Sequence, residues 1–256
     1  MTDALAIQLR VVKGLALRDL AGQFGKRGTG IVFTFVTPMM QSAIIALMRL
    51  VAGAPGYGGM EIFPFTVCGV LYFRAFSLMN MALVDSLNQN RGLLYFHHVT
   101  ELDIYLGKFV TQLTINLTVA LVIYVAMRMA GVAPPADEPF FLLLLLIAAN
   151  VFGFGFGLVI ASLSLIVPKL QSLNRILNRI LYFTSGIFFA VPEVPPAIRE
   201  YLLYNPLLSM TEWSRSFYFL QYQTVYGNLY YFAEFLVVFV VLGLLLERLL
   251  RDRLVR

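Results

Sequence analysis

Long apolar stretches alternate with short polar connections along the whole chain. A membrane core of about 30 Å needs roughly 20 mainly apolar residues per helix. Six stretches approach or exceed that length: residues 31–52, 62–84, 104–128, 139–167, 176–192 and 229–250, with 176–192 the shortest. This pattern predicts an all-α polytopic membrane protein with six transmembrane helices.

Three further segments are too polar to span a membrane, yet each keeps a set of apolar positions. Residues 5–26 alternate aliphatic and charged residues, which is typical of an amphipathic helix lying at the membrane interface. Residues 86–102 are expected to form a cytoplasmic helix whose apolar face needs a partner surface. Residues 193–220 combine prolines with aromatic residues, which favours short re-entrant external helices between the last two spans. Together these segments predict one domain over residues 1–256.

Composition and charge agree with a membrane domain and indicate its orientation. The chain is 59% hydrophobic and only 13% charged, whereas soluble domains are about a quarter charged. Fourteen Lys and Arg residues fall on one side of the predicted spans and four on the other, with Arg74 inside a span. Since positively charged loops stay cytoplasmic, we expect both termini in the cytoplasm and an even number of crossings. The N-terminal segment lacks the order of a signal peptide, so the first span is expected to remain in the mature protein.

The sequence offers little that would support catalysis, metal binding or nucleic-acid binding. Cys68 is the single cysteine, so neither an internal disulfide nor a thiolate metal site can form. The GKRGTG run at 25–30 lacks the spacing and context of a Walker A loop. His97 and His98 are adjacent, so they point in different directions on a helix and make a poor metal pair. We therefore expect no catalytic residue, no metal and no cofactor in this chain, and no nucleic-acid partner.

Polar residues inside the predicted spans are candidates for a transport path. Thr34, Thr37 and Gln41 recur at helical spacing in the first span, and interhelical hydrogen bonds explain such a stripe as well as a polar path does. Arg74 is either half of a structural pair or a substrate contact, because ionisable groups within a membrane are costly. The glycines of the GFGFG run at 153–157 are interpreted as a site of close helix packing.

Three segments, taken in order, resemble a known family. They are LALRDLAGQFGKRGTG followed by Pro38, then NQNRGLLYFHHVTELDIYLGK, and then the stretch from PKLQSLNRILNRIL through Asn205-Pro206-Leu207 to Glu212 and Arg215. This order is similar to the permease subunits of ABC-2 type polysaccharide exporters, above all those for lipid-anchored, group 2 capsular polysaccharide. The likeness runs from about residue 12 to about residue 250. The chain departs from the family at Thr37, where an acidic residue is usual, and at His98, where proline is usual.

The resemblance implies a homodimer in the bacterial inner membrane with two copies of a cytoplasmic ABC ATPase, which would bind ATP and Mg. The substrate would be a lipid-linked acidic polysaccharide, passed on to a periplasmic polysaccharide co-polymerase-like adaptor and an outer-membrane exporter. Uptake of the lipid headgroup and substrate is assigned to Arg18, Lys26 and Arg27. Coupling to the ATPase is assigned to Asn88, Arg91, Leu94, Phe96 and Glu101. Channel lining is assigned to Thr37, Gln41, Arg74, Tyr182, Phe183, Phe188 and Phe189, and an external gate to Tyr201, Tyr204, Asn205, Glu212, Trp213 and Arg215.

Other functions stay open at this point. An ABC-2 exporter of drugs or other small molecules shares the six-span plan, and so does an exporter of O-antigen or teichoic acid. A polytopic glycosyl or acyl transferase would need acids and histidines clustered at one membrane face. The acids Asp85, Glu101 and Asp103 bracket His97 and His98 in the sequence, so this class is retained as the less favoured alternative.

Overall fold

The structure of the protein is a computed structural model that describes residues 2–24, 29–54, 56–90, 92 and 100–250. Within these residues all regular structure is helical, which confirms the all-α class. The helices are α1 (Thr2–Phe24), α2 (Thr29–Val51), α3 (Ile62–Asn90), α4 (Glu101–Met129), α5 (Pro139–Ser164), α6 (Leu170–Thr184), the 3-10 helix η2 (Val191–Glu193), α7 (Pro196–Leu202), α8 (Pro206–Tyr218) and α9 (Leu229–Leu250).

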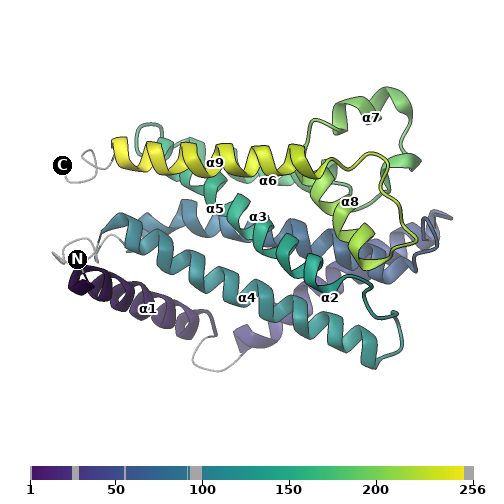
Figure 1. Cartoon of the computed structure of the whole chain (residues 1–256), viewed down its shortest axis with the longest axis horizontal. Helices are drawn as coiled ribbons and strands as arrows, with labels where there is room; N and C mark the ends of the chain where they lie inside the picture. Colours follow the sequence, from purple (N-terminus) through teal and green to yellow (C-terminus); the bar gives the residue numbers. More distant parts are fainter. Residues whose placement is uncertain (1, 25–28, 55, 91, 93–99, 251–256) are drawn as a thin grey trace.

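The long helices run along one axis of the molecule (Figure 1). The start of α1 and the end of α9 lie at one end of the bundle, here called the inner end, and α7 and α8 lie at the opposite, outer end. Among the described residues, five helices are long and apolar enough to cross a membrane, namely α2, α3, α4, α5 and α9. The predicted spans at 31–52, 62–84, 104–128, 139–167 and 229–250 thus each correspond to one helix.

The predicted span at 176–192 differs most from the structure. Helix α6 begins earlier, at Leu170, and ends at Thr184, so it has 15 residues. At 1.5 Å per residue its length is about 22 Å, which is shorter than a membrane core. The apolar run beyond Thr184 belongs to a turn through Gly186, whose φ is +72°, and to η2. The hydropathy window therefore merged a short helix with the turn that follows it.

The expected coupling helix at 86–102 is described only at its two ends, and its middle lies outside the described residues. Helix α3 continues to Asn90, and α4 starts at Glu101 behind a capping box formed by Thr100 and Asp103. Both described ends of this segment therefore belong to long helices, because α3 is still helical at one end and a strong N-cap begins α4 at the other. The assigned residues Arg91, Leu94 and Phe96 lie outside the described residues.

Helix α3 lies in the middle of the bundle and contacts α2, α4, α5 and α8. The GFGFG run makes this packing possible, as its sequence pattern indicates. A Cβ at Gly153 would lie 2.5 Å from the backbone oxygen of Phe76 in α3, and one at Gly155 would lie 2.6 Å from the backbone nitrogen of Val240 in α9. Since only glycine permits such an approach, α5 is held closely between α3 and α9.

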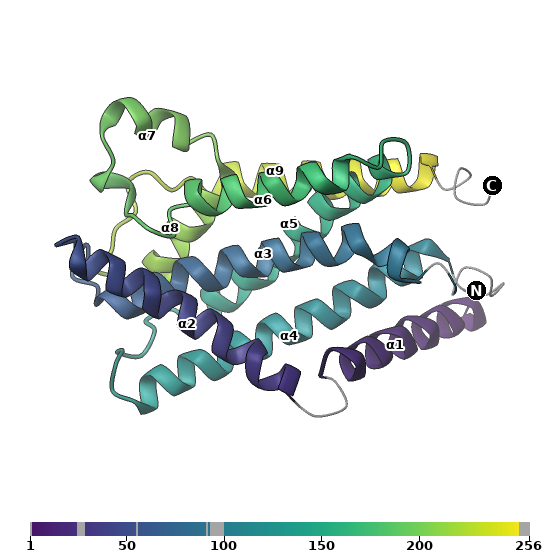
Figure 2. The same cartoon turned by 180° about the vertical axis from the view of Figure 1, so that it is seen from behind.

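Helix α1, the segment expected at the membrane interface, lies along α4 (Figure 2). The Thr111 hydroxyl of α4 donates a hydrogen bond to the backbone oxygen of Ala16 at 3.3 Å, and Lys108 forms an ion pair with Asp19 at 2.9 Å. This contact fixes α1 against the inner half of the bundle.

Candidate translocation site

Two cavities share one face of α3. The first has a volume of about 420 Å³ and is lined by residues of α1, α2, α3 and α4. The second has a volume of about 320 Å³ and lies between α2, α3 and α6. Arg74, Leu78 and Met81 line both cavities. Their spacing of four and three residues places them on one side of α3, so this side is a continuous wall between the two spaces.

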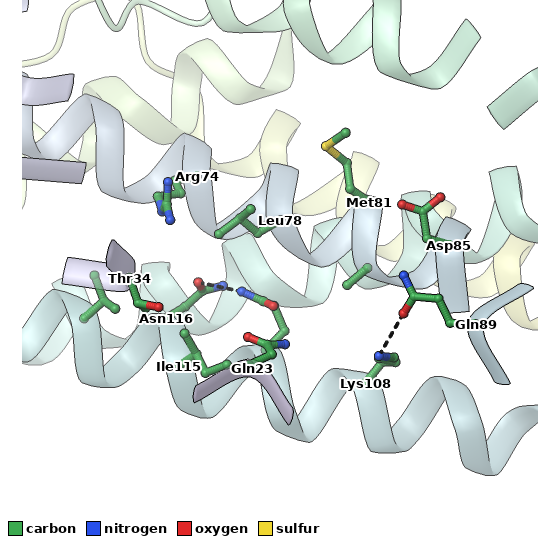
Figure 3. Close-up of a pocket in the computed structure, with 13 residues that line it drawn as sticks. Gln23, Thr34, Arg74, Leu78, Met81, Asp85, Gln89, Lys108, Ile115 and Asn116 are labelled. Atoms are coloured by element: carbon green, nitrogen blue, oxygen red, sulfur yellow. Dashed lines mark hydrogen bonds between the residues drawn. The ribbon is translucent and has the colours of Figure 1, made fainter. Parts of the chain in front are cut away.

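The polar part of the lining of the first cavity consists of amides, a threonine and a few charges, and apolar residues complete the wall (Figure 3). Gln112 donates a hydrogen bond to Asn116 at 3.1 Å, and Lys108 donates one to Gln89 at 3.4 Å. Burial alone would raise the pKa of Asp19 beside this cavity, but hydrogen bonds and charge from Lys108 and Arg18 lower it below its ordinary value. Asp19 is therefore ionised near neutral pH, and it holds Lys108 in place at the cavity.

The second cavity combines arginines with aromatic rings. Gln41 of α2 donates a hydrogen bond to the Tyr182 hydroxyl of α6, which joins these two helices across the cavity. Phe183 also lines the cavity, and its ring stacks on Phe188 with centroids 5.3 Å apart and planes 11° apart. Aromatic faces of this kind are suited to stacking on the apolar faces of sugar rings.

Helix α6 is held against α3 by buried amides. Asn80 and Asn174 exchange two hydrogen bonds, at 3.1 and 3.3 Å, and Asn178 donates to the backbone oxygen of Asn174 at 2.9 Å. Each of these asparagines is almost fully buried. Because Asn174 and Asn178 face α3, Arg175 and Arg179 are turned to the exposed side of α6, where they line the second cavity. The amide pair thus fixes where the α6 arginines stand.

The structure brings together four of the seven residues assigned to channel lining. Gln41, Arg74, Tyr182 and Phe183 all line the second cavity. The other three stand elsewhere: Thr37 is exposed on α2 and donates to the backbone oxygen of Phe33, Phe188 stacks on Phe183, and Phe189 contributes its backbone oxygen to Arg215.

Arg215 and Glu212, assigned to an external gate, form a buried ion pair in α8. Their side chains are 0% and 2% exposed, and Arg215 Nη1 lies 3.1 Å from Glu212 Oε1. Arg215 also donates to the backbone oxygens of Gly186 and Phe189 at 2.6 and 3.2 Å, and its guanidinium lies 3.6 Å from the Phe65 ring centroid. The pair therefore anchors the turn after α6 to the core.

A second arginine holds the same turn from the end of α2. Arg49 donates to the backbone oxygen of Phe188 at 2.7 Å and forms an ion pair with Glu193 at 2.7 Å. Burial would raise the pKa of Glu193, but hydrogen bonds from Arg49 and from the Ala190 N–H keep that pKa below its ordinary value. We call the two ion pairs, Arg49–Glu193 and Arg215–Glu212, the outer clamp.

Of the remaining gate candidates, two make internal hydrogen bonds and two are exposed. Asn205 caps α8 by accepting from the Leu207 N–H at 3.0 Å, and Trp213 donates to the backbone oxygen of Gly227 at 3.0 Å. Tyr201 and Tyr204 are 77% and 75% exposed. The outer segment therefore presents two tyrosines to its surroundings, while Glu193, Glu212 and Arg215 are used internally.

The candidates at the inner end are only partly described. Arg18 pairs with Asp19 at 2.8 Å and donates to Asn90, so it links α1 to the end of α3. Glu101 is buried in the first turn of α4. Lys26 and Arg27 lie outside the described residues, as does the side chain of Asn88, whose backbone belongs to α3.

Sequence reasoning missed the arginines and asparagines of α6 as site residues. It used Arg175 and Arg179 only to orient the chain in the membrane. The signal was present, because Asn174 and Asn178 are spaced like Arg175 and Arg179, four residues apart and separated by the apolar pair Ile176 and Leu177. Residues four apart lie on the same face of a helix, so the two asparagines mark one polar face of α6 and the two arginines mark a second face beside it.

Long apolar helices around an arginine-containing polar face are the mark of a polytopic membrane transport protein. The ABC-2 type transporter family matches residues 10–219, so the chain belongs to that family, and the resemblance seen in the sequence is confirmed.

Full-length relatives point to one branch of the family. Capsule polysaccharide export inner-membrane protein CtrC of Neisseria meningitidis is 29% identical over 244 residues, which cover 94% of this chain and 91% of the relative. Polysialic acid transport protein KpsM of Escherichia coli is 27% identical and covers 94% of each chain. Capsule polysaccharide export inner-membrane protein BexB of Haemophilus influenzae is 23% identical, covering 96% of this chain and 93% of the relative.

Proposed function

We propose that this chain is the permease subunit of an ATP-driven exporter that moves a lipid-linked acidic capsular polysaccharide across the bacterial inner membrane. The observation that carries this proposal is the full-length similarity to three inner-membrane proteins named for capsule or polysialic acid export. The two cavities support it, because they combine amide, arginine and aromatic side chains along one wall of α3. These groups suit hydroxyls, acidic groups and sugar ring faces respectively.

The work of transport would come from a partner. Two copies of a cytoplasmic ABC ATPase would bind ATP and Mg and push on the inner end, around the connection between α3 and α4. We expect the double substitution of Leu94 and Phe96 by serine to abolish export while membrane insertion stays normal, because an apolar docking face would be lost. Polymer at the surface and permease in the membrane fraction are the two measurements. Normal export by this variant would refute the coupling assignment.

The assembly and topology follow from the same proposal. Both termini would be cytoplasmic, and α6 together with the turn and η2 that follow it would make the sixth crossing, which brings the ends of the chain to one side. Two copies would face each other to close a channel around the polymer, since each of the two cavities described above lies between a few helices of one copy. A periplasmic adaptor and an outer-membrane exporter would continue the route at the outer end, where Tyr201 and Tyr204 are exposed.

Deletion of the gene in its native host, followed by fractionation, tests the function directly. Full-length polymer retained in the cytoplasm would support the proposal, and complementation with the intact gene should return polymer to the surface. Normal surface polymer would instead favour export of a small molecule. Loss of all polymer would favour a membrane transferase.

A further inference from the structure

Helix α9 runs along the outside of the bundle and packs on the rest of the chain through one face (Figure 1). The Phe239 ring stacks on Phe156 of α5 with centroids 5.0 Å apart, and a Cβ at Gly243 would lie 2.8 Å from the backbone oxygen of Gly155. Only 11% of the most apolar stretch of α9 is buried, against 72% in α3. The face of α9 that points away from α5 is therefore exposed.

The exposed face carries residues at the spacing of a coiled coil. Successive members are four, three, four, three and four residues apart, and all are exposed: Tyr230, Glu234, Val237, Val241, Leu244 and Arg248. Helices that cross at a small angle pack through residues repeated in this way. These six residues, here called the α9 seam, extend over about 27 Å of helix, which is nearly the thickness of a membrane core.

Glu234 is an acid within this seam, at a depth where lipid chains would surround it. It lies five residues after the start of α9 at Leu229, or about 7 Å along the helix. Because the whole of α9 is about 33 Å long and matches the membrane core, this position lies inside the hydrocarbon. None of the described side chains forms an ion pair or a hydrogen bond with Glu234. A carboxylate in this place is costly unless a positive charge lies beside it.

The charge of Glu234 decides which kind of neighbour suits the seam. Lipid chains offer no positive charge at this depth. In a two-fold dimer with both copies in the same orientation, two α9 seams would place Glu234 opposite Glu234, and like charges repel strongly where the dielectric constant is low. A second copy of this chain is therefore a poor partner for the seam. A helix with a basic residue at the same depth would neutralise the carboxylate.

We propose that the α9 seam binds a transmembrane helix of a different membrane protein, one that carries a lysine or an arginine one to two turns below its outer end. That cation pairs with Glu234, and Val237, Val241 and Leu244 pack on the apolar residues that follow it. The inference goes beyond the proposed function and does not depend on the cargo, because α9 lines neither cavity.

Site-specific photocrosslinking of the full-length chain in membranes of its native host tests the proposal. Benzoylphenylalanine is placed at Val237 or Val241, and at Leu121 of α4 as the control, because Leu121 is also apolar and 65% exposed. We expect both seam positions to form an adduct with another inner-membrane protein that Leu121 does not form. Mass spectrometry of the adduct should identify a protein with a basic residue near the outer end of a transmembrane helix.

Charge variants then test the ion pair itself. E234Q and E234K should each lower the adduct yield about tenfold, as expected for the loss of one interhelical polar contact. Replacing the partner's basic residue with glutamate should restore the adduct with E234K, which a misfolded variant would not allow. E200K is the matched control, because Glu200 is an exposed acid outside α9, and its adduct yield should be unchanged.

Several outcomes would overturn the proposal. Adducts with lipid alone, or with a second copy of this chain, would show that the seam has no foreign helix against it. A partner without a basic residue at that depth, an unchanged yield in both E234Q and E234K, or no recovery after the exchange of charges would refute the ion pair. Normal surface polymer in the deletion strain would refute the proposed cargo alone, since crosslinking at the seam does not require export.

Discussion

The ion pair between Arg215 and Glu212 gives the most direct test of how the outer segment is held. Arg215→Met keeps much of the side-chain volume but removes the charge and every donor. Among the described residues, Glu212 is then a buried carboxylate that keeps the hydrogen bond from the Tyr222 hydroxyl, 2.7 Å away. The backbone oxygens of Gly186 and Phe189 lose the donor that now reaches them.

The magnitude follows from the burial of both partners. Removing one member of a buried ion pair costs about 3–5 kcal/mol, because the other charge stays in place without compensation. Native proteins have only about 5–15 kcal/mol of stability in total. We therefore expect Arg215→Met to lower the free energy of unfolding by about 3–5 kcal/mol.

A double-mutant cycle separates the ion pair from the carbonyl contacts. Glu212→Leu combined with Arg215→Met removes both charges. What is lost is then a set of neutral partners' hydrogen bonds, to the backbone oxygens of Phe65, Gly186 and Phe189 and from the Tyr222 hydroxyl, at about 1 kcal/mol each or less. The double variant should be less destabilised than Arg215→Met alone. Reversible unfolding of the purified chain in mixed detergent micelles measures each free energy.

Arg199→Met is the matched control for this cycle. Arg199 donates to the backbone oxygens of Pro192 and Val194 and to the Tyr226 hydroxyl, but it is partly exposed and has no described carboxylate partner. Its substitution should cost only about 1–2 kcal/mol. A loss below about 1 kcal/mol in Arg215→Met, or additive losses in the double variant, would refute the assignment of a buried, coupled pair.

Three further predictions concern other contacts, and the same unfolding measurement checks each. Arg49 keeps the pKa of Glu193 below its ordinary value. The stability that this ion pair contributes should therefore be present above about pH 4.5 and be lost as the pH falls through the lower pKa of the folded state. Arg49→Met should remove that pH dependence. Asn80→Leu should lower the free energy of unfolding by about 1 kcal/mol. Asn174→Leu in the same chain should recover part of that loss, because neither member of the Asn80–Asn174 pair is then left without the other. Gly155→Ala should cost about 1–3 kcal/mol, since the new methyl group would force α5 and α9 apart.

Each of these three predictions has a contrary result. Unchanged pH dependence in Arg49→Met would show that Glu193 is stabilised by other groups. Equal and additive losses at Asn80 and Asn174 would show that their amides do not act as a pair. Gly14→Ala is the control for the glycine test, because a Cβ at Gly14 meets nothing within 4 Å.

The helices that hydropathy predicts well are those whose ends coincide with a change from apolar to polar residues. The window at 229–250 matches α9, which runs from Leu229 to Leu250. Helix α4 begins at Glu101, before the apolar run, because Thr100 and Asp103 cap it through hydrogen bonds that a hydropathy average does not register. Such local signals extend helices beyond their apolar cores.

The parts that could not be predicted depend on contacts between distant residues. Asn174 and Asn178 lower the apolar character of α6, yet they are buried, because Asn80 satisfies the Asn174 amide from α3. Gln41 and Tyr182 are 141 residues apart in the chain and meet only in the folded bundle. Their types marked them as candidates, but the cavity that unites them with Arg74 is a product of tertiary packing.

The outer clamp binds main-chain atoms, and this has an evolutionary consequence. Arg49 and Arg215 hold the turn through the backbone oxygens of Gly186, Phe188 and Phe189. Every amino acid carries that oxygen, so the side chains at 188 and 189 can be exchanged during descent while the path of the backbone persists. Gly186 is the exception, because its φ of +72° disfavours any side chain. A lineage of such permeases can therefore alter the aromatic surface beside the cavity to suit a new cargo without rebuilding the scaffold that presents it.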